Sequence, residues 1–305
     1  MSGVVDDKSD HCVPFILNHM SEKSSVTDDI PRSPIFIGVN GPQGSGKTTL
    51  VSTLAEKLRQ PPHSYSTIVL SIDDLYLTHE QQSELAASHP SNPLIQHRGQ
   101  PSTHDLPLAL YLFSDLQHGK VTKIPSYDKS AYSGQGDRVP KEEWPEVNRD
   151  KTHKTEVVLF EGWCVGFRAL PRDNLVQDWE GAVREREKGH YVGRLGWNRL
   201  EDVDFVNEAL RRYDQLTDQL DALIHLDAED PIFVYDWRSQ SERKLREKKG
   251  SGMTDEQVVD FVNGYYPAYE LFTTRLRAGA FDEGKGRQLR LVIGRDRRVR
   301  EVVRL

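Results

Sequence analysis

The sequence predicts an α/β fold, in which a doubly wound, mostly parallel five-stranded sheet carries helices on both faces. Three observations predict it: five short apolar runs, helical patterns between them, and a glycine-rich turn directly after the first run. The runs are rich in leucine or β-branched residues and too short to be helices, as expected for strands that are covered on both faces. The predicted strands are residues 35–40, 68–72, 157–160, 222–226 and 289–293.

Helical patterns separate these strands. Residues 49–58 follow the first strand, and residues 106–117 follow a loop rich in proline and glycine. Residues 203–220 carry apolar side chains at helical spacing, which predicts one amphipathic helix before the fourth strand. Alternation of strands and helices is typical of a doubly wound parallel sheet.

The composition limits the function classes. The chain has 305 residues, a mass of 34.8 kDa and a net charge of −7, which fits one large domain and argues against binding of nucleic acid or anionic membranes. Its two cysteines, Cys12 and Cys164, build no disulfide framework, and no apolar run is long enough to span a membrane. The acidic start of the chain does not resemble a targeting peptide, so we expect a cytoplasmic protein without a membrane or nucleic-acid partner.

Four regions follow from the pattern along the chain. Residues 1–33 are predicted to be an N-terminal arm packed on a main domain of residues 34–305. Within that domain, residues 173–198 are charged and glycine-rich and indicate an inserted excursion. Residues 228–252 are rich in arginine and lysine and directly follow the fourth strand, at the sheet edge where ligands bind in such folds.

The glycine-rich turn is a phosphate-binding loop. Residues 41–48 read GPQGSGKT and match G-x-x-x-x-G-K-[ST] in full, between a predicted strand and a predicted helix. Backbone amides of such a loop surround phosphates, Lys47 is expected to reach the β- and γ-phosphates, and Thr48 to bind Mg²⁺. The alternative, a chance glycine-rich turn, does not explain the full match. The predicted ATP-binding residues are Gly41, Pro42, Gln43, Gly44, Ser45, Gly46, Lys47, Thr48 and Thr49. The fold is therefore predicted to be that of the P-loop NTPases.

Acidic residues follow two of the predicted strands on the side of the phosphate loop. The second strand leads into Asp73 and Asp74, and the third into Glu161. Asp73 is placed either to accept the proton of an attacking hydroxyl or to hold Mg²⁺ through water, and Glu161 to orient Mg²⁺ or its water shell. The alternative is that Asp73 and Asp74 cap the next helix. We predict Thr48, Asp73 and Glu161 as the residues around the metal.

Three further side chains suit an acceptor pocket. Arg98 can hold a carboxylate with two hydrogen bonds, or it can be an ordinary surface residue. Asp105 can cap the helix that follows or accept hydrogen bonds from hydroxyls of the acceptor. Lys129 has a charge that suits either a carboxylate of the acceptor or the phosphoryl group in transfer.

The order of five segments resembles a known superfamily. GPQGSGKT, SIDDLY, HRGQPSTHDLPLAL, IPSYDKS and VVLFEGW are similar in type and order to segments of the uridine kinase, phosphoribulokinase and pantothenate kinase superfamily. The later segment WRSQSERKLREKKGSGMTDEQVVDFVNGYYPAYE resembles the branch of plant-type D-glycerate 3-kinases and their fungal relatives, described as probable ATP-dependent kinases. The excursion at residues 173–198 and the WRSQSERKLRE segment differ from uridine kinases.

The resemblance implies roles for residues. Asp73 matches the general base of these kinases, and Glu161 the acid after the third strand. The segments that surround the acceptor in these kinases hold Tyr76, Arg98, Asp105, Tyr127 and Lys129. The basic stretch 228–252 corresponds to a lid, and Arg238 and Arg246 are its predicted catalytic residues; the alternative for these cations is a solvated helical face. The predicted catalytic set is thus Lys47, Asp73, Glu161, Arg238 and Arg246.

We therefore expect an ATP- and Mg²⁺-dependent kinase that phosphorylates a hydroxyl of a small metabolite, with D-glycerate as the leading acceptor. One alternative is a nucleoside-like or pantothenate-like acceptor. Another is a P-loop ATPase or GTPase that acts as a switch, although the sequence carries no N-K-x-D motif for guanine after a later strand. A third is a protein that holds ATP without turnover, which the intact set Lys47, Thr48, Asp73 and Glu161 disfavours.

Overall fold

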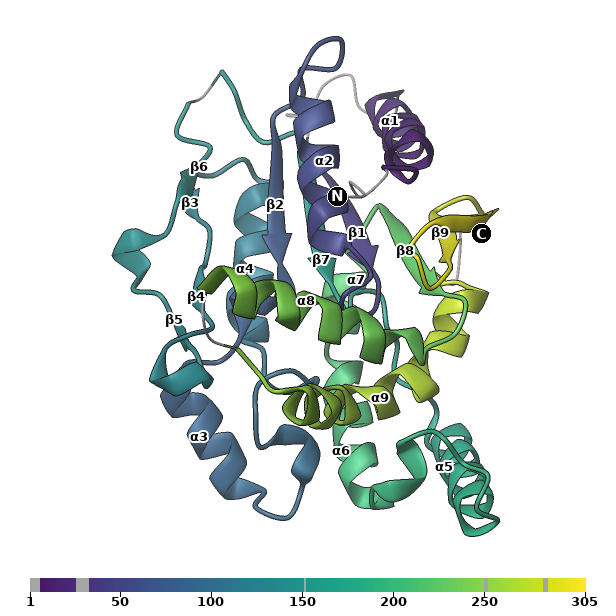
Figure 1. Cartoon of the computed structure of the whole chain (residues 1–305). Helices are drawn as coiled ribbons and strands as arrows, with labels where there is room; N and C mark the ends of the chain where they lie inside the picture. The colour runs from purple at the N-terminus through teal and green to yellow at the C-terminus, as the bar shows by residue number, and fades with distance from the viewer. Residues whose placement is uncertain (1–5, 26–32, 151, 250–251, 282–284) are drawn as a thin grey trace.

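A six-stranded sheet forms the centre of the molecule (Figure 1). The computed structural model describes residues 6–25, 33–150, 152–249, 252–281 and 285–305. The strand order is β10-β9-β8-β1-β7-β2, and all neighbours are parallel except β9 and β10. The strands are β1 (Ile35–Asn40), β2 (Thr67–Ser71), β7 (Val157–Gly162), β8 (Ala222–Ala228), β9 (Gln288–Ile293) and β10 (Val299–Arg304).

The prediction of five strands was wrong by one. The five predicted runs correspond to β1, β2, β7, β8 and β9, and β10 adds an antiparallel strand at the edge. Its sequence, VREVVR, is half charged, and most of its side chains are exposed. An edge strand with one open face lacks the continuous apolar run that identified the other five.

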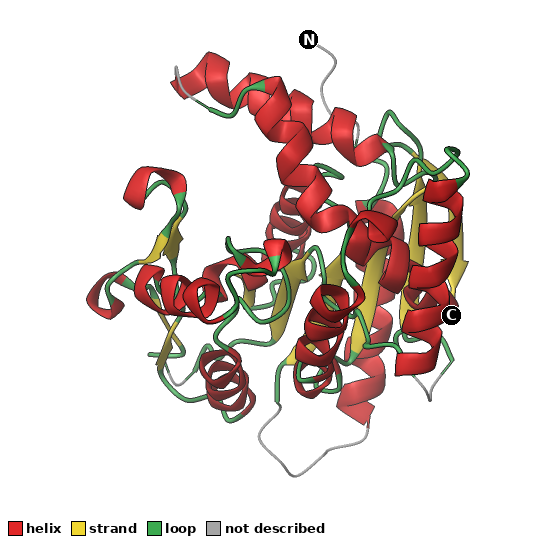
Figure 2. Cartoon of the chain, turned by 90° about the horizontal axis from the view of Figure 1, so that it is seen from below, coloured by secondary structure: helices red, strands yellow, loops and turns green. Residues whose placement is uncertain are grey.

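Helices cover both faces of the sheet (Figures 1 and 2). In Figure 1, α2 lies in front of the central strands and α4 behind them. In the described part of the chain the helices are α1 (Ser9–Ser25), α2 (Lys47–Arg59), α3 (His79–Ser88), α4 (Leu106–Gln117), α5 (Arg172–Glu187), α6 (Leu200–Arg211), α7 (Asp214–Thr217), α8 (Phe233–Lys249) and α9 (Asp255–Ala278). Within these residues, no helix is both long and apolar enough to cross a membrane.

Short strands and single-turn helices form the connection between α4 and β7, and further single-turn helices lie in other connections. Two small antiparallel pairs lie there, β3 (Thr122–Lys123) with β6 (Glu146–Val147), and β4 (Tyr127–Asp128) with β5 (Asp137–Arg138). The single-turn helices are η1 (Ile72–Leu75), η2 (Pro93–Ile95), η3 (Tyr132–Gly134), η4 (Lys141–Glu143) and η5 (Leu195–Trp197).

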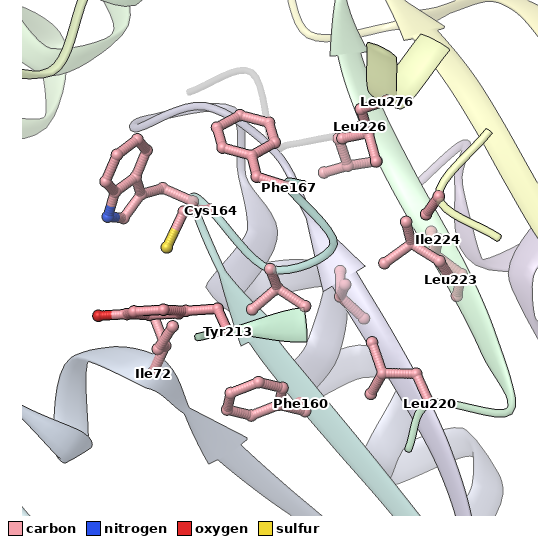
Figure 3. Packing of buried hydrophobic residues seen from close by; sticks show 14 of the residues in the cluster. Ile72, Phe160, Cys164, Phe167, Tyr213, Leu220, Leu223, Ile224, Leu226 and Leu276 are labelled. Carbon is pink, nitrogen blue, oxygen red and sulfur yellow. The ribbon is translucent and has the colours of Figure 1, made fainter. Parts of the chain in front are cut away.

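The predicted continuous helix at residues 203–220 was also wrong. The chain forms α6, turns at Tyr213, and continues as the single turn α7. The backbone amide of Tyr213 donates to the carbonyl of Leu210, three residues earlier, which ends the α-helical pattern. Tyr213 is buried in the core, beside Phe160 of β7 and Ile72 (Figure 3).

The N-terminal helix packs on the main domain. Cys12, Phe15 and Ile16 of α1 are fully buried in the hydrophobic core. Residues 1–5 and 26–32 of the predicted arm lie outside the described residues.

Residues of the predicted excursion bind to α9. They form most of α5 and then η5. In this segment, Tyr191 and the backbone amides of Arg194 and Leu195 donate hydrogen bonds to Glu270 of α9. The side chain of Arg194 also donates to Asn263 of α9 across 2.7 Å.

Candidate active site

The phosphate-binding loop connects β1 to α2, which begins at Lys47, two residues before the range 49–58 that was predicted for this helix. Gly44 and Gly46 have φ angles of +76° and +98°, which side chains rarely allow. A Cβ atom added at Gly46 would meet no atom within 4 Å, so open space lies in front of the loop. Within the described residues, the buried hydroxyl of Ser45 has no hydrogen-bond partner. The loop is thus an open cradle with unused polar capacity, which suits a phosphate group.

Lys47 interacts electrostatically with the two predicted acids. Its ammonium donates to the carbonyl of Pro42 across 3.2 Å. Burial lowers the pKa of Lys47, and the charges of Glu161 and Asp73 oppose that shift. The cation and the two carboxylates therefore form one electrostatic cluster at the carboxyl ends of β2 and β7.

Asp73 is held by two side chains. The phenol of Tyr76 donates to Oδ1 of Asp73 across 2.9 Å, and the ammonium of Lys129 forms an ion pair with Oδ2. Burial acts to raise the pKa of Asp73, but the charge of Lys129 and the two hydrogen bonds outweigh it and hold the pKa below its ordinary value. Three residues predicted for the site thus lie in direct contact.

Glu161 lies inside β7, one residue before its end, rather than after the strand. It is only 9% exposed, and its Oε1 accepts a hydrogen bond of 3.0 Å from the hydroxyl of Ser71 in the adjacent strand β2. Parallel pairing of Ser71 with Glu161 brings these side chains together at the edge that carries the phosphate loop.

An aromatic wall stands beside Asp73. The ring of Tyr76 stacks on His104 at 4.5 Å and meets Tyr127 edge-on at 5.4 Å. His104 is buried, which lowers its pKa to about 4, so the imidazole is neutral at pH 7. The backbone amide of Tyr127 donates to Asp74, whose burial raises its pKa to about 6.

Arg98 is bound to backbone oxygens. Its guanidinium donates to the carbonyls of Gly134 and Gln135 and lies 5.7 Å from the ring centre of Tyr127. A longer hydrogen bond of 3.4 Å reaches the carbonyl of Lys129. Arg98 thus holds the turn between β4 and β5, which carries Lys129.

Asp105 performs the capping function that was one of its two predicted roles. Its Oδ1 accepts from the amide of Leu108 at the start of α4, and its Oδ2 pairs with Arg138 at 3.0 Å. Sequence reasoning did not select Arg138, whose guanidinium also donates to the carbonyl of Tyr76. The observation that places Arg138 at the site is its pairing with Tyr127 between strands β5 and β4.

The two predicted lid arginines bind within the α8–α9 hairpin. Arg238 pairs with Glu242 at 2.6 Å and lies over the ring of Phe261. Arg246 donates to the carbonyl of Met253 and pairs with Asp255 at 2.8 Å. Figure 1 shows α8 crossing the carboxyl ends of the central strands, with α9 beneath it. The helix is therefore beside the phosphate loop, while these two side chains are bound to other residues.

Two tyrosines of α9, from the YYPAY run, reach the site. The hydroxyl of Tyr269 accepts from the amide of Gln43 in the phosphate loop. The hydroxyl of Tyr265 donates to the carbonyl of Arg98. Both rings are buried against Trp163, so packing and contact with the site are combined in the same residues.

The position of Asp73 defines the class of the protein. A carboxylate that interacts electrostatically with the phosphate-loop lysine and is held by a tyrosine and a second lysine is typical of a P-loop kinase site. A family model described as "Phosphoribulokinase / Uridine kinase family" matches residues 36–169. The chain belongs to this family and is an ATP-dependent small-molecule kinase.

Three similar proteins extend the comparison beyond that region. An uncharacterized kinase, mug58 of Schizosaccharomyces pombe, is 39% identical over 78% of this chain and 81% of its own length. Chloroplastic D-glycerate 3-kinase of Arabidopsis thaliana is 38% identical over 88% of this chain, which spans 53% of that protein. A solved structure of D-glycerate 3-kinase from Cryptococcus neoformans matches with a TM-score of 0.86 and 32% identity, over 97% of this chain and 98% of the other.

Proposed function

We propose that this kinase transfers the γ-phosphoryl group of ATP to a hydroxyl of D-glycerate. The observation that carries the proposal is the ion pair between Lys129 and Asp73, which brings a cation for an acidic acceptor next to a base for its hydroxyl. The names of two similar proteins, one of which matches nearly the whole chain, support the same acceptor.

Asp73 accepts the proton of the attacking hydroxyl in this proposal. Its half-buried carboxylate is oriented by Tyr76, and its lowered pKa keeps it ionised at neutral pH. Lys47 binds the transferred phosphoryl group from the other side. The reaction forms a bond from the acceptor oxygen to the γ-phosphorus and breaks the bond from that phosphorus to the bridging oxygen of ADP, while the hydroxyl proton passes to Asp73.

In this proposal, the carboxylate of the acceptor is held by cationic side chains near Asp73. Lys129 is 55% exposed and can move from Asp73 to an incoming carboxylate. Arg138 has a buried Nε atom without a hydrogen-bond partner in the described chain, and Arg98 holds the turn from which Lys129 extends. Guanidinium and ammonium groups are the usual partners of small carboxylates.

The oxygen ligands in this region fit Mg²⁺. The hydroxyl of Thr48 and the carboxylates of Asp73 and Glu161 are hard donors, of the kind that Mg²⁺ prefers together with phosphate oxygens and water. The described residues contain no group of three or more His, Cys, Asp or Glu side chains arranged to hold a metal by themselves. A site that is completed by nucleotide and water is the usual arrangement for Mg²⁺ in kinases. When bound, the ion neutralises charge on the phosphates.

The test is a product assay with a panel of acceptors. The full chain is incubated with MgATP and D-glycerate, glycerol, uridine, pantothenate or no acceptor, with Lys47→Ala as the blank, and ADP and the phosphorylated product are both measured. We expect turnover with D-glycerate, little with glycerol, which lacks the carboxylate, and none in the blank. Turnover with uridine or pantothenate instead would assign the acceptor to another class. Lys47-dependent ADP release without any phosphorylated acceptor would point to an ATPase.

A further inference from the structure

The turn between β9 and β10 lies against the phosphate-binding loop. Arg297 in this turn donates from Nε to the carbonyl of Gly44, in the middle of GPQGSGKT, across 2.7 Å. Its Nη1 donates to Oε1 of Gln240 across 2.8 Å, and its Nη2 is 3.5 Å from the carbonyl oxygen of Trp237. One guanidinium thus joins the phosphate loop, helix α8 and the last strand pair.

The charge of Arg297 has no carboxylate partner in the described part of the chain, where its hydrogen bonds go to neutral oxygens. Two nearby arginines differ, because Arg295 of the same turn pairs with Asp236, and Arg300 of β10 pairs with Asp296. Burial lowers the pKa of Arg297, but a guanidinium keeps its proton at neutral pH. A cation with neutral partners, directly behind a phosphate loop, leaves its field available to the bound anion.

The backbone of the turn favours another residue type. Arg297 has a φ angle of +63°, the left-handed region, where glycine or asparagine costs less than arginine. An arginine at this position therefore does not stabilise the backbone of the turn. The three contacts of its side chain account for the presence of arginine here.

Trp237 completes the connection. Its ring is fully buried, its indole donates to the carbonyl of Arg295 across 2.7 Å, and Arg297 lies 5.5 Å from its centre. The phosphate loop touches this residue directly, since a Cβ atom added at Gly44 would lie 2.7 Å from Cβ of Trp237. Helix α8 is thus fixed to the loop at Trp237, one residue before Arg238.

We propose that Arg297 is a positioning residue for the nucleotide. It holds the Gly44 carbonyl on the outer side of the loop, away from the phosphates, and fixes the loop to α8. Its removal weakens ATP binding and leaves acceptor binding unchanged. This role rests on the proposed use of MgATP as donor and not on D-glycerate as acceptor.

The experiment is direct titration of the full chain with MgATP in the absence of an acceptor, by calorimetry, for wild type, Arg297→Gln, Arg297→Lys and Arg295→Gln. Arg295 is the matched control, because its 69% exposed side chain also ties the turn to α8 but does not contact the loop. We expect Arg297→Gln to raise the Kd for ATP about 10-fold, the loss of one charged hydrogen bond. Lysine keeps the charge and a donor, so Arg297→Lys should recover part of this loss, and Arg295→Gln should bind like wild type.

Two further readouts separate positioning from general damage. Where an acceptor supports turnover, its KM should stay within about twofold of wild type in Arg297→Gln while the KM for ATP rises. An unchanged Kd for ATP in folded Arg297→Gln, or an equal rise in both KM values with a lower Tm, would overturn the proposal. If Arg297→Gln does not fold, Arg297→Lys carries the test, because one ammonium cannot replace the three guanidinium contacts. A folded Arg297→Lys with wild-type affinity for ATP then overturns the proposal. Failure of D-glycerate as acceptor leaves the titration intact, whereas wild type that binds no MgATP ends both proposals.

Discussion

The phenol of Tyr76 donates a 2.9 Å hydrogen bond to the carboxylate of Asp73, three residues earlier in the chain. Both residues belong to the single turn η1 and its end, directly after β2. The hydroxyl of Ser71 caps this turn by accepting from the backbone amide of Asp73, and it also donates to Glu161. A short local motif thus orients the candidate base and connects it to the second acid of the site.

Replacement of Tyr76 by phenylalanine removes the hydrogen bond and keeps the ring stacked on His104. A hydrogen bond to a charged group contributes about 1.5–3 kcal/mol, so we expect kcat to fall about 10–100-fold. The KM for ATP should change little, because Tyr76 contacts Asp73, His104 and Tyr127, none of which belongs to the phosphate loop. The matched control is Tyr132→Phe in the neighbouring turn, where the ring is 57% exposed and stacks on His79. Equal rates for the two variants would argue against a catalytic role of the Tyr76 phenol.

The adjacent residues Asp73 and Asp74 allow an isosteric comparison. Asp73→Asn removes the proposed base, and we expect kcat to fall by about 10²–10⁴ while MgATP still binds. Asp74 accepts from the amide of Tyr127, and an asparagine oxygen can accept the same bond, so Asp74→Asn should lower kcat less than about 10-fold. Steady-state rates and ATP titrations of both variants provide the measurement. A larger loss in Asp74→Asn than in Asp73→Asn would show that Asp73 is not the base.

The parallel sheet and the phosphate loop were predictable because each is encoded in a short stretch. A strand that is buried on both faces needs a continuous apolar run, and all five such strands were found within a few residues of their true bounds. The loop needs fixed residue types at fixed spacing, and α2 begins at Lys47 as its motif requires. Strand β10 escaped prediction because most of its side chains are exposed, which leaves VREVVR free to be charged.

The contacts of the site were harder to predict, because they depend on segments far apart in the chain. Lys129 meets Asp73 across 56 residues, and Arg297 meets Gly44 across 253. No local pattern encodes such a pair. A residue type alone also does not tell whether a cation is used by a substrate or by the fold. Arg98, which was predicted to bind the acceptor because of its hydrogen-bond donors, donates to backbone carbonyls instead.

Asp227, near the end of β8, offers a test of stability. It is 1% exposed and binds Arg277 through two hydrogen bonds of 2.8 and 2.9 Å and Arg290 at 2.6 Å. Asp227→Asn leaves two partly buried guanidinium groups without their counter-charge, so we expect the free energy of unfolding to fall by about 3–5 kcal/mol. Urea unfolding followed by circular dichroism measures it.

The control for that prediction is Asp236→Asn. Asp236 pairs with Arg295 at 2.6 Å, but both side chains are exposed, by 40% and 69%. Exposed pairs contribute less than about 1 kcal/mol, so this variant should unfold nearly like wild type. Similar losses for Asp227→Asn and Asp236→Asn would mean that burial of the Asp227 network contributes nothing beyond an ordinary surface pair.

His225 predicts how stability depends on pH. It is 2% exposed within β8, its Nδ1 has no hydrogen-bond partner among the described residues, and burial lowers its pKa to about 4. The nearby Asp227 acts to raise that pKa, while Arg290 and Arg277 lower it further. In the unfolded chain a histidine has a pKa of about 6.5. Between these values the unfolded state binds a proton that the folded state does not.

Stability must therefore fall as the pH falls from about 6.5 to about 4, because protonation favours the unfolded chain. One pKa unit corresponds to about 1.4 kcal/mol, so His225 should account for a loss of about 2 kcal/mol between pH 7 and pH 5. His225→Gln removes this titration, and its unfolding free energy should drop by about 2 kcal/mol less than that of wild type over the same interval. Replacement of the exposed His118 by glutamine serves as the control and should leave the slope unchanged. Carboxylates that titrate in this range contribute equally to all three proteins, so they cancel in the comparison. Parallel pH curves for wild type and His225→Gln would show that His225 is protonated as easily in the folded protein as in the unfolded chain.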